Sequence, residues 1–126
     1  PPDRVIHADF DTQGGRESAQ RLLAAHPNLT AMYAVNDFAA IGAMGAVREA
    51  GLIPGVSMAL IGYNDTPLAA ELPIPLATLS NPVHLLGQKS MNLLFRLLAG
   101  EPCTSIVLKP TFVFRESAAF SARSLI

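Results

Sequence analysis

Three predicted strands in this sequence each end in a short polar motif: HADFD (7–11), VNDF (35–38) and GYND (62–65). The carboxyl ends of parallel strands lie along one edge of a sheet, and ligands of open α/β folds bind outside that edge. Asparagine amides donate and accept hydrogen bonds, and an aromatic ring offers a flat stacking face, so these motifs suit a neutral ligand rich in hydroxyl or amide groups. We therefore predict one crevice lined by Phe10, Asn36, Asp37, Asn64 and Asp65.

Several of these residues also have a purely structural interpretation. Asp37 is well placed to cap the helix that follows it, and Asp65 to close a turn with Thr66-Pro67. Phe10 could lie in the core, since aromatic side chains are usually buried. The two asparagines are harder to explain by stability, because a strand end on a sheet edge rarely needs an amide there. Asn64 is the strongest single candidate for a ligand contact.

The residues that could support catalysis are not arranged for it. His7, His26 and His84 stand in unrelated contexts, and no pair has metal-ligand spacing such as HxxxH. The sequence has no GxSxG elbow, and its lone cysteine, Cys103, follows a proline in a predicted turn. Gly14-Gly15 could cradle a phosphate before a helix, but the phosphate-loop and dinucleotide patterns are absent, so a turn is the better interpretation. We predict no enzyme activity, no metal and no cofactor.

The composition indicates one well-packed globular domain. The chain has 126 residues, of which 50% are hydrophobic and 15% charged. A net charge of −1 with scattered basic residues does not indicate a nucleic-acid or anionic-membrane surface, and no stretch approaches the ~20 apolar residues of a membrane span. A single cysteine permits no internal disulfide, which favours a reducing compartment such as the cytoplasm. Because the chain opens on proline rather than methionine, we expect a piece of a longer protein.

The elements that must position the polar motifs alternate between strand and helix. Apolar runs predict strands at 5–10, 30–35 and 57–62, and one-sided patterns predict helices at 16–25 and 38–50. This alternation is typical of right-handed βαβ units and a parallel sheet, and continuous apolar strands indicate that both sheet faces are covered. We therefore predict an α/β fold. Arg48 and Glu49 are the only charged residues of the helix predicted at 38–50, so most of its surface must be buried.

The second half of the chain loses this regular alternation. Residues 66–82 carry four prolines, Pro67, Pro73, Pro75 and Pro82, and predict a long extended connection. An amphipathic helix is predicted at 83–99, followed by two strands, SIVLK (105–109) and TFVF (111–114), split by Pro110. The change of pattern predicts that this part belongs to another sheet.

The motifs, in their order, resemble the lactose-repressor/galactose-repressor (LacI/GalR) family of bacterial transcription regulators. The resemblance is carried by ADFDTQGGRESAQRLL, PNLTAMYAVNDFAAIGAMGAVREAGLIPG, VSMALIGYNDTPLAAELPIPLATLSNPVHLLG, LLAGEP and PTFVFRES. It implies a periplasmic-binding-protein-like type I lobe: a parallel sheet flanked by helices, in an effector domain of two lobes. Residues 1–80 would be part of the second lobe, 81–110 would belong to the first lobe, and 111–126 would be a return strand and tail.

The resemblance also assigns roles to individual residues. Phe10 matches the aromatic residue that stacks on the effector, Asn36 the amide of the asparagine-aspartate motif, and Asn81 a polar hinge position. Asn64 matches a position that is usually aspartate, and a neutral amide there changes which groups it can bind. The resemblance places the family's dimer interface at Phe38, Ile41, Gly45, Ala70 and Leu72, with Gly42 and Gly45 leaving room for close approach. The alternative is that this surface is buried only against the missing lobe.

The function implied is that of an effector sensor in a DNA-binding regulator, usually a repressor. The effector would be a sugar, polyol, nucleoside or purine, and a homodimer would bind operator DNA through a helix-turn-helix domain absent from this chain. One alternative is a periplasmic or surface solute-binding protein of an uptake system. A small α/β enzyme is a further alternative, although no nucleophile–base or metal constellation supports it.

Overall fold

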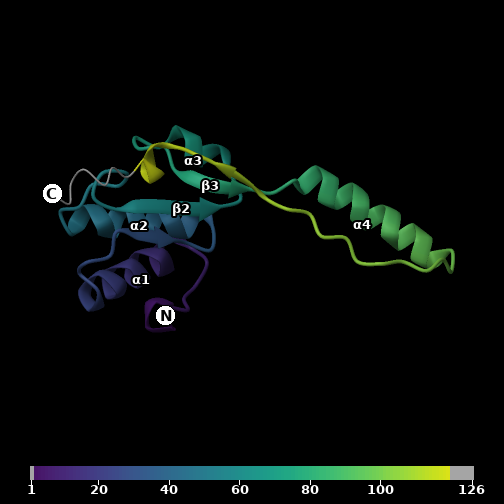
Figure 1. Cartoon of the computed structure of the whole chain (residues 1–126), viewed down its shortest axis with the longest axis horizontal. Coiled ribbons are helices and arrows are strands. Elements are labelled where there is room, and N and C mark those ends of the chain that lie inside the picture. The colour runs from purple at the N-terminus through teal and green to yellow at the C-terminus, as the bar shows by residue number, and fades with distance from the viewer. Residues whose placement is uncertain (1, 120–126) are drawn as a thin grey trace.

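The computed structural model describes residues 2–119, which form a four-stranded sheet and its surrounding helices (Figure 1). The strands are β1 (Ala31–Tyr33), β2 (Ala59–Tyr63), β3 (Ala77–Ser80) and β4 (Thr111–Val113), in the spatial order β1-β2-β3-β4. β1, β2 and β3 are parallel, whereas β4 runs antiparallel to β3. The prediction that the second half of the chain belongs to another sheet is therefore wrong for β3 and β4, which pair within this sheet. The predicted α/β class, with a parallel sheet flanked by helices, is confirmed.

Helices α1 (Thr12–Ala25) and α2 (Asp37–Glu49) pack together on one side of the sheet (Figure 1). Their contact is close enough that a Cβ atom at Gly15 would meet the backbone of Ala39, and one at Gly42 the backbone of Thr12. Between the helices and the sheet lies the apolar core, whose largest fully buried side chains are those of Met58, Leu60, Leu76 and Val47.

The prediction that Gly14-Gly15 form a turn before the helix is wrong. Both glycines lie inside the first turns of α1, which begins at Thr12. Asp11 caps the helix, because its carboxylate accepts a hydrogen bond of 2.7 Å from the Gly14 amide. The glycines occur here because the neighbouring backbone leaves no room for side chains.

Helix α2 is apolar on nearly all sides because it lies between the sheet and α1. Ala40, Ala46 and Val47 are almost completely buried in this position. The glycines that we expected to allow a second subunit to approach instead face α1: Gly42 meets its backbone, and Gly45 the guanidinium group of Arg16. Most of the cover that this helix needs therefore comes from within the chain.

Residues 5–10 do not form the predicted first strand. Among the described residues, β1 pairs with β2 and with no second strand. A cavity separates the segment from β1, with residues of both along its walls. An apolar run becomes a strand only when a neighbour supplies the ladder of hydrogen bonds, and here none is within reach.

The proline-rich segment 66–82 is not one extended connection. It contains the short helix α3 (Pro67–Glu71) and strand β3. Pro67 occupies a first-turn position, where the missing amide hydrogen costs nothing and the fixed φ favours the helix. Three of the four prolines thus lie between elements, and the fourth starts one.

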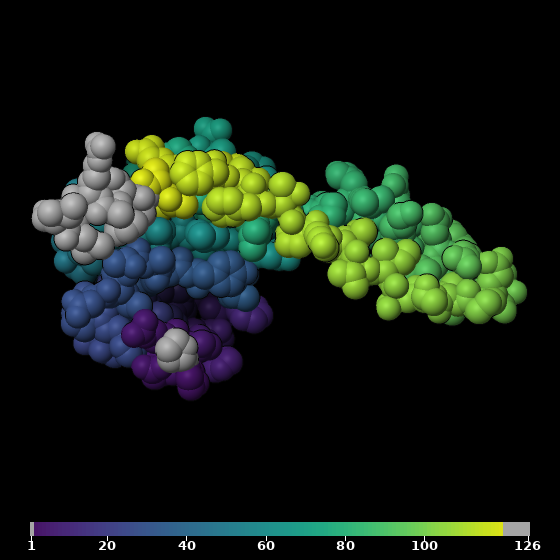
Figure 2. Space-filling view, in the orientation of Figure 1, coloured from purple at the N-terminus to yellow at the C-terminus, as the bar shows by residue number. Residues whose placement is uncertain are grey.

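Residues 81–110, which we call the arm, project away from the sheet (Figures 1 and 2). The arm consists of helix α4 (Val83–Leu98) and an irregular segment, 99–110, that returns to β4. No residue of α4 is buried. The strand predicted at 105–109 is absent, because no other strand of the described chain pairs with this segment; only 111–113 of the second predicted strand pairs.

The last described element is the short 3₁₀ helix η2 (Glu116–Ala118), which docks against β2 and β3. Ser117 is fully buried, and its hydroxyl donates to the Leu60 carbonyl at 2.7 Å and accepts from the Ala77 amide at 2.8 Å. The end of the predicted tail, 120–126, lies outside the described residues. Within residues 2–119, no helix has the length and apolar character needed to cross a membrane.

Candidate functional site

The three predicted asparagines all follow parallel strands at the carboxyl edge of the sheet. Asn36 comes shortly after β1, Asn64 directly after β2 and Asn81 directly after β3. The structure joins two of them, since the Asn81 amide nitrogen donates to the Asn64 side-chain oxygen at 3.3 Å. Asn36 is joined to Phe10, whose backbone carbonyl accepts a hydrogen bond of 2.8 Å from the Asn36 amide nitrogen. The predicted edge therefore carries two contacting pairs.

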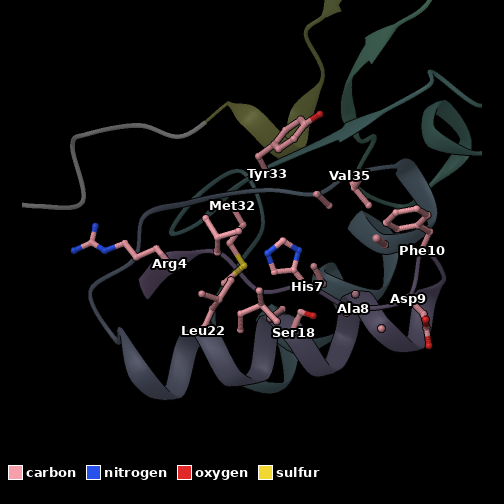
Figure 3. Close-up of a pocket in the computed structure, with 18 of the residues that line it drawn as sticks. Arg4, His7, Ala8, Asp9, Phe10, Ser18, Leu22, Met32, Tyr33 and Val35 are labelled. Carbon is pink, nitrogen blue, oxygen red and sulfur yellow. The ribbon is translucent and has the colours of Figure 1, made fainter. Parts of the chain in front are cut away.

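Phe10 is a surface residue. Its side chain is 70% exposed and lies beside Val35 at the end of the strand region (Figure 3). The core interpretation of this ring is therefore wrong, and the ring is open for stacking. Asn64 is also exposed, whereas Asn36 and Asn81 are half-buried.

The helix cap predicted for Asp37 is provided by Asn36 in the structure. Asn36 caps α2, because its side-chain oxygen accepts from the Ala39 amide at 2.8 Å. Asp37 is completely buried and accepts from the Thr66 amide at 2.7 Å, the Thr66 hydroxyl at 3.0 Å and the Thr78 hydroxyl at 2.6 Å. Asp37 therefore neither caps the helix nor faces a ligand, and instead ties the start of α2 to β3 and to the loop after β2.

The Asp65 side chain forms an ion pair with Arg115 and does not close the predicted turn with Thr66-Pro67. Its carboxylate lies 2.6 Å from the Arg115 guanidinium group, and its backbone amide donates to the Thr78 hydroxyl at 3.3 Å. Arg115 and Thr78 were both missed by the sequence analysis. Arg115 belongs to the RES triplet that contributed to the family resemblance, but nothing in the triplet itself indicates a partner fifty residues earlier.

Because both aspartates have internal partners, the edge offers a ligand mainly neutral groups. Asn36 uses one donor and one acceptor position internally, and Asn64 and Asn81 share one hydrogen bond, so each amide keeps further capacity. Within residues 2–119, no buried side-chain nitrogen or oxygen lacks a hydrogen-bond partner. Three amides and an exposed ring without a net charge suit a polyhydroxylated or heterocyclic ligand.

A cavity of about 730 Å³ lies next to this edge, between residues 4–10, α1 and β1 (Figure 3). Its walls are mostly apolar side chains such as Ile6, Leu22 and Met32, with His7 and Ser18 among the few polar groups. Of the predicted ligand-binding residues, only Phe10 lines it. The cavity therefore adjoins the candidate site at Phe10, but none of the three asparagines lines it.

The fold perturbs the ionisation of Tyr33 on β1. Partial burial, and next the nearby phenol of Tyr63, raise the pKa of Tyr33 above its ordinary value. A raised pKa means that the folded state holds this proton more firmly than the unfolded chain. The associated stability is present below the ordinary tyrosine pKa and is lost as the pH rises through the folded-state value.

The residues predicted for a dimer interface lie on α2, on α3 and just after α3. Phe38 is 49% exposed and Ala70 is exposed, while Ile41, Gly45 and Leu72 are half-buried. Ile41 and Leu72 also pack partly against the core. This surface is open in the described chain, and its role in dimerisation stays a prediction.

A periplasmic binding protein-like domain family matches residues 1–118. The lactose operon repressor of Rhizobium radiobacter is 40% identical over 106 residues, which cover 82% of this chain and 93% of that protein. The ribose operon repressor of Haemophilus influenzae is 33% identical over 118 residues, covering 92% of this chain but 36% of that repressor. This chain therefore spans about a third of the length of some of its relatives.

Solved structures give the same result. A LacI family regulator from an Arthrobacter species in complex with lactose matches with a TM-score of 0.78 and 30% identity, covering 90% of this chain and 43% of that one. The lac repressor dimer bound to operator and an anti-inducer matches with a TM-score of 0.82 and 31% identity, covering 88% of this chain and 39% of that one. These similar proteins are transcription regulators, which favours that interpretation over the transport and enzyme alternatives.

Proposed function

Because this chain belongs to the LacI/GalR family of regulators with a periplasmic-binding-protein-like domain, we propose that it forms most of the second lobe of an effector-binding domain. In this proposal, residues 1–80 form one wall of the effector cleft. Residues 81–110 belong to the first lobe, and the segment from 111 onward returns to the second. The domain senses a small molecule for a DNA-binding regulator that works in the cytoplasm, and it carries out no catalysis.

The observation that carries this proposal is the convergence of Asn36, Asn64 and Asn81 on the carboxyl edge of the sheet. Their neighbouring carboxylates are held internally, so the edge can bind a ligand through neutral hydrogen bonds and through the ring of Phe10. A sugar is the effector class that best fits, because each amide can donate to and accept from adjacent hydroxyl groups. Lactose, bound by one structural relative, is the natural first probe.

The exposed area supports the proposal that the rest of the first lobe packs against the arm. A compact monomer of 13.3 kDa is expected to expose about 6,500 Å². This chain exposes 8296 Å², about 1,800 Å² more. One partner in a standard protein interface covers about 800 Å², so the excess is large enough for docking against another body. The apolar side chains of α4, among them Leu86, Leu94 and Leu98, account for part of it.

In the proposed mechanism, effector and operator select between two arrangements of the lobes. A ligand bound between the lobes favours the arrangement in which its contacts on both sides are made, and it shifts the equilibrium only by its differential affinity. A homodimer, for which Phe38, Ile41, Gly45, Ala70 and Leu72 are the proposed contact residues, would transmit this shift to helix-turn-helix domains outside this chain.

Ligand binding should depend on the side chain of Asn64. We expect one compound from a panel of lactose, ribose, polyols, nucleosides and purines to raise the melting temperature of the full-length gene product. The Asn64→Gly variant should lose this shift, because glycine keeps the positive φ of 108° without strain and removes only the amide. Thermal-shift screening, followed by titration calorimetry on each hit, measures the effect.

The matched control is Asn28→Ala, in the exposed turn between α1 and β1 at the opposite edge of the sheet. This variant should keep the full ligand-induced shift. A hit that stabilises the Asn64→Gly protein as strongly as the parent would show that the effector does not bind at the amide-bearing edge.

The isolated 126-residue chain should associate. We expect dimers or larger species at tens of micromolar, because the free edge of β1 and the uncovered apolar side of α4 are both open to a second copy. Sedimentation velocity over a concentration series tests this. A single monomeric species across the series would contradict the proposal that these surfaces need a partner.

A further inference from the structure

We infer that Arg115 is a positioning residue: it holds the Asn64-Asp65 loop in its ligand-binding conformation and links that loop to the arm. The part of this inference that concerns ligand binding rests on the proposed function. The conformation of the loop can be measured without any ligand, so the positioning role of Arg115 and the proposed function can be refuted separately.

The loop after β2 has an unusual backbone. Asn64 has a φ of 108° and Asp65 a φ of 55°, and within residues 2–119 these are the only non-glycine residues with positive φ. Such conformations are disfavoured by side chains and persist only where surrounding contacts enforce them. They occur at the one residue that the sequence marks as the strongest ligand contact and at its neighbour.

Two sets of contacts hold this loop. From β3, the Thr78 hydroxyl accepts the Asp65 amide hydrogen at 3.3 Å, while it donates to the buried Asp37 at 2.6 Å. From just after β4, one terminal nitrogen of Arg115 pairs with the Asp65 carboxylate at 2.6 Å. Its other terminal nitrogen donates a hydrogen bond of 2.9 Å to the Leu76 carbonyl. The pair is largely shielded, with side-chain exposures of 18% for Arg115 and 25% for Asp65, so it is little screened by solvent.

Both connections of the arm lead to this loop. The outgoing connection starts at Asn81, which donates to the Asn64 side chain. The returning connection enters β4, where Val113 pairs with Thr78, and Arg115 follows two residues later. Any change in the direction of the arm therefore reaches Asn64 from one side and Asp65 from the other. This arrangement would couple the position of the first lobe, which is proposed to cover the arm, to the conformation of Asn64.

The test compares Arg115→Gln with Arg96→Gln in the full-length gene product. Arg96 is a matched control, because its exposed ion pair with Glu101 at 2.8 Å lies within the arm, so the same charge is removed away from the loop. The first readout is the amide resonances and the HN–Hα couplings of Asn64 and Asp65 without ligand, which report φ. The second is lactose affinity by calorimetry, with a urea unfolding curve for each variant.

We expect Arg115→Gln to change the signals and couplings of Asn64 and Asp65 and to weaken lactose binding by at least about tenfold, equivalent to about 1.4 kcal/mol. Arg96→Gln should change neither. Adding Asp65→Asn to Arg115→Gln should cause no further loss, because both act through one contact. A folded Arg115→Gln protein with unchanged Asn64 and Asp65 signals would overturn the inference. If the parent protein binds no lactose, lactose is not its effector, and the couplings alone decide whether Arg115 positions the loop.

Discussion

Replacing Asp37 with alanine should lower the free energy of unfolding by about 3 kcal/mol or more, because three donors lose their acceptor in a largely buried site. The carboxylate is completely buried and accepts from the Thr66 amide, the Thr66 hydroxyl and the Thr78 hydroxyl. Against a typical domain stability of about 5–15 kcal/mol, this loss is large. Urea unfolding of the 126-residue chain at low concentration, followed by circular dichroism, measures it.

The control for this prediction is Asp11→Ala, which removes another aspartate that accepts a backbone hydrogen bond. Asp11 is exposed and caps α1, so its loss should cost about 1 kcal/mol. Similar unfolding midpoints for the two variants would mean that the Asp37 network contributes no more than a surface cap. Because Thr66 and Thr78 adjoin the Asn64-Asp65 loop, Asp37→Ala should also disturb the candidate site.

The substitution Gly42→Ala should destabilise the chain by about 2–3 kcal/mol, although alanine is the better helix former. Gly42 lies inside α2, and a Cβ atom there would meet the carbonyl of Thr12 and the backbone nitrogen of Arg16, 2.9 Å away. Backbone atoms cannot rotate aside as a side chain can, so α1 and α2 must separate. Urea unfolding monitored by circular dichroism reports the loss.

Gly87→Ala is the matched control, since Gly87 also lies within a helix, α4, but apart from the neighbouring backbone of that helix no atom would lie within 4 Å of the added carbon. In the 126-residue chain this change should leave the unfolding midpoint in place and slightly increase the helical signal. If Gly42→Ala proved neutral or stabilising as well, the close contact between α1 and α2 would not be a constraint on this fold.

The main elements of the fold could be predicted from residue periodicity. The predicted helices at 38–50 and 83–99 correspond to α2 and α4 within one residue at each end, and the predicted strands at 30–35 and 57–62 contain β1 and most of β2. These predictions succeed because helix and strand formation in these segments follows local apolar spacing. The family resemblance, carried by contiguous motifs, was also available from the sequence and is confirmed by the comparisons.

The partners of polar side chains could not be predicted in the same way. Asn36 and Asp37 are adjacent, and either can cap the helix that follows them. The choice depends on Thr66 and Thr78, which lie 29 and 41 residues from Asp37 and surround its carboxylate. The same limit applies to Asp65, whose partner Arg115 follows fifty residues later.

The sequence by itself determined α2, α4, β1 and β2, the parallel sheet and the edge at which the asparagines gather, because each depends on local periodicity or on strand direction. Only the tertiary structure decided which polar groups are available to a ligand. In the folded chain, the carboxylates of Asp37 and Asp65 are bound by internal partners, and Phe10 is exposed. Asn64 and Asn81 are hydrogen-bonded to each other. It also decided that residues 5–10 are not a strand and that α4 is uncovered, since strand pairing and burial both require a neighbour that sequence periodicity does not specify.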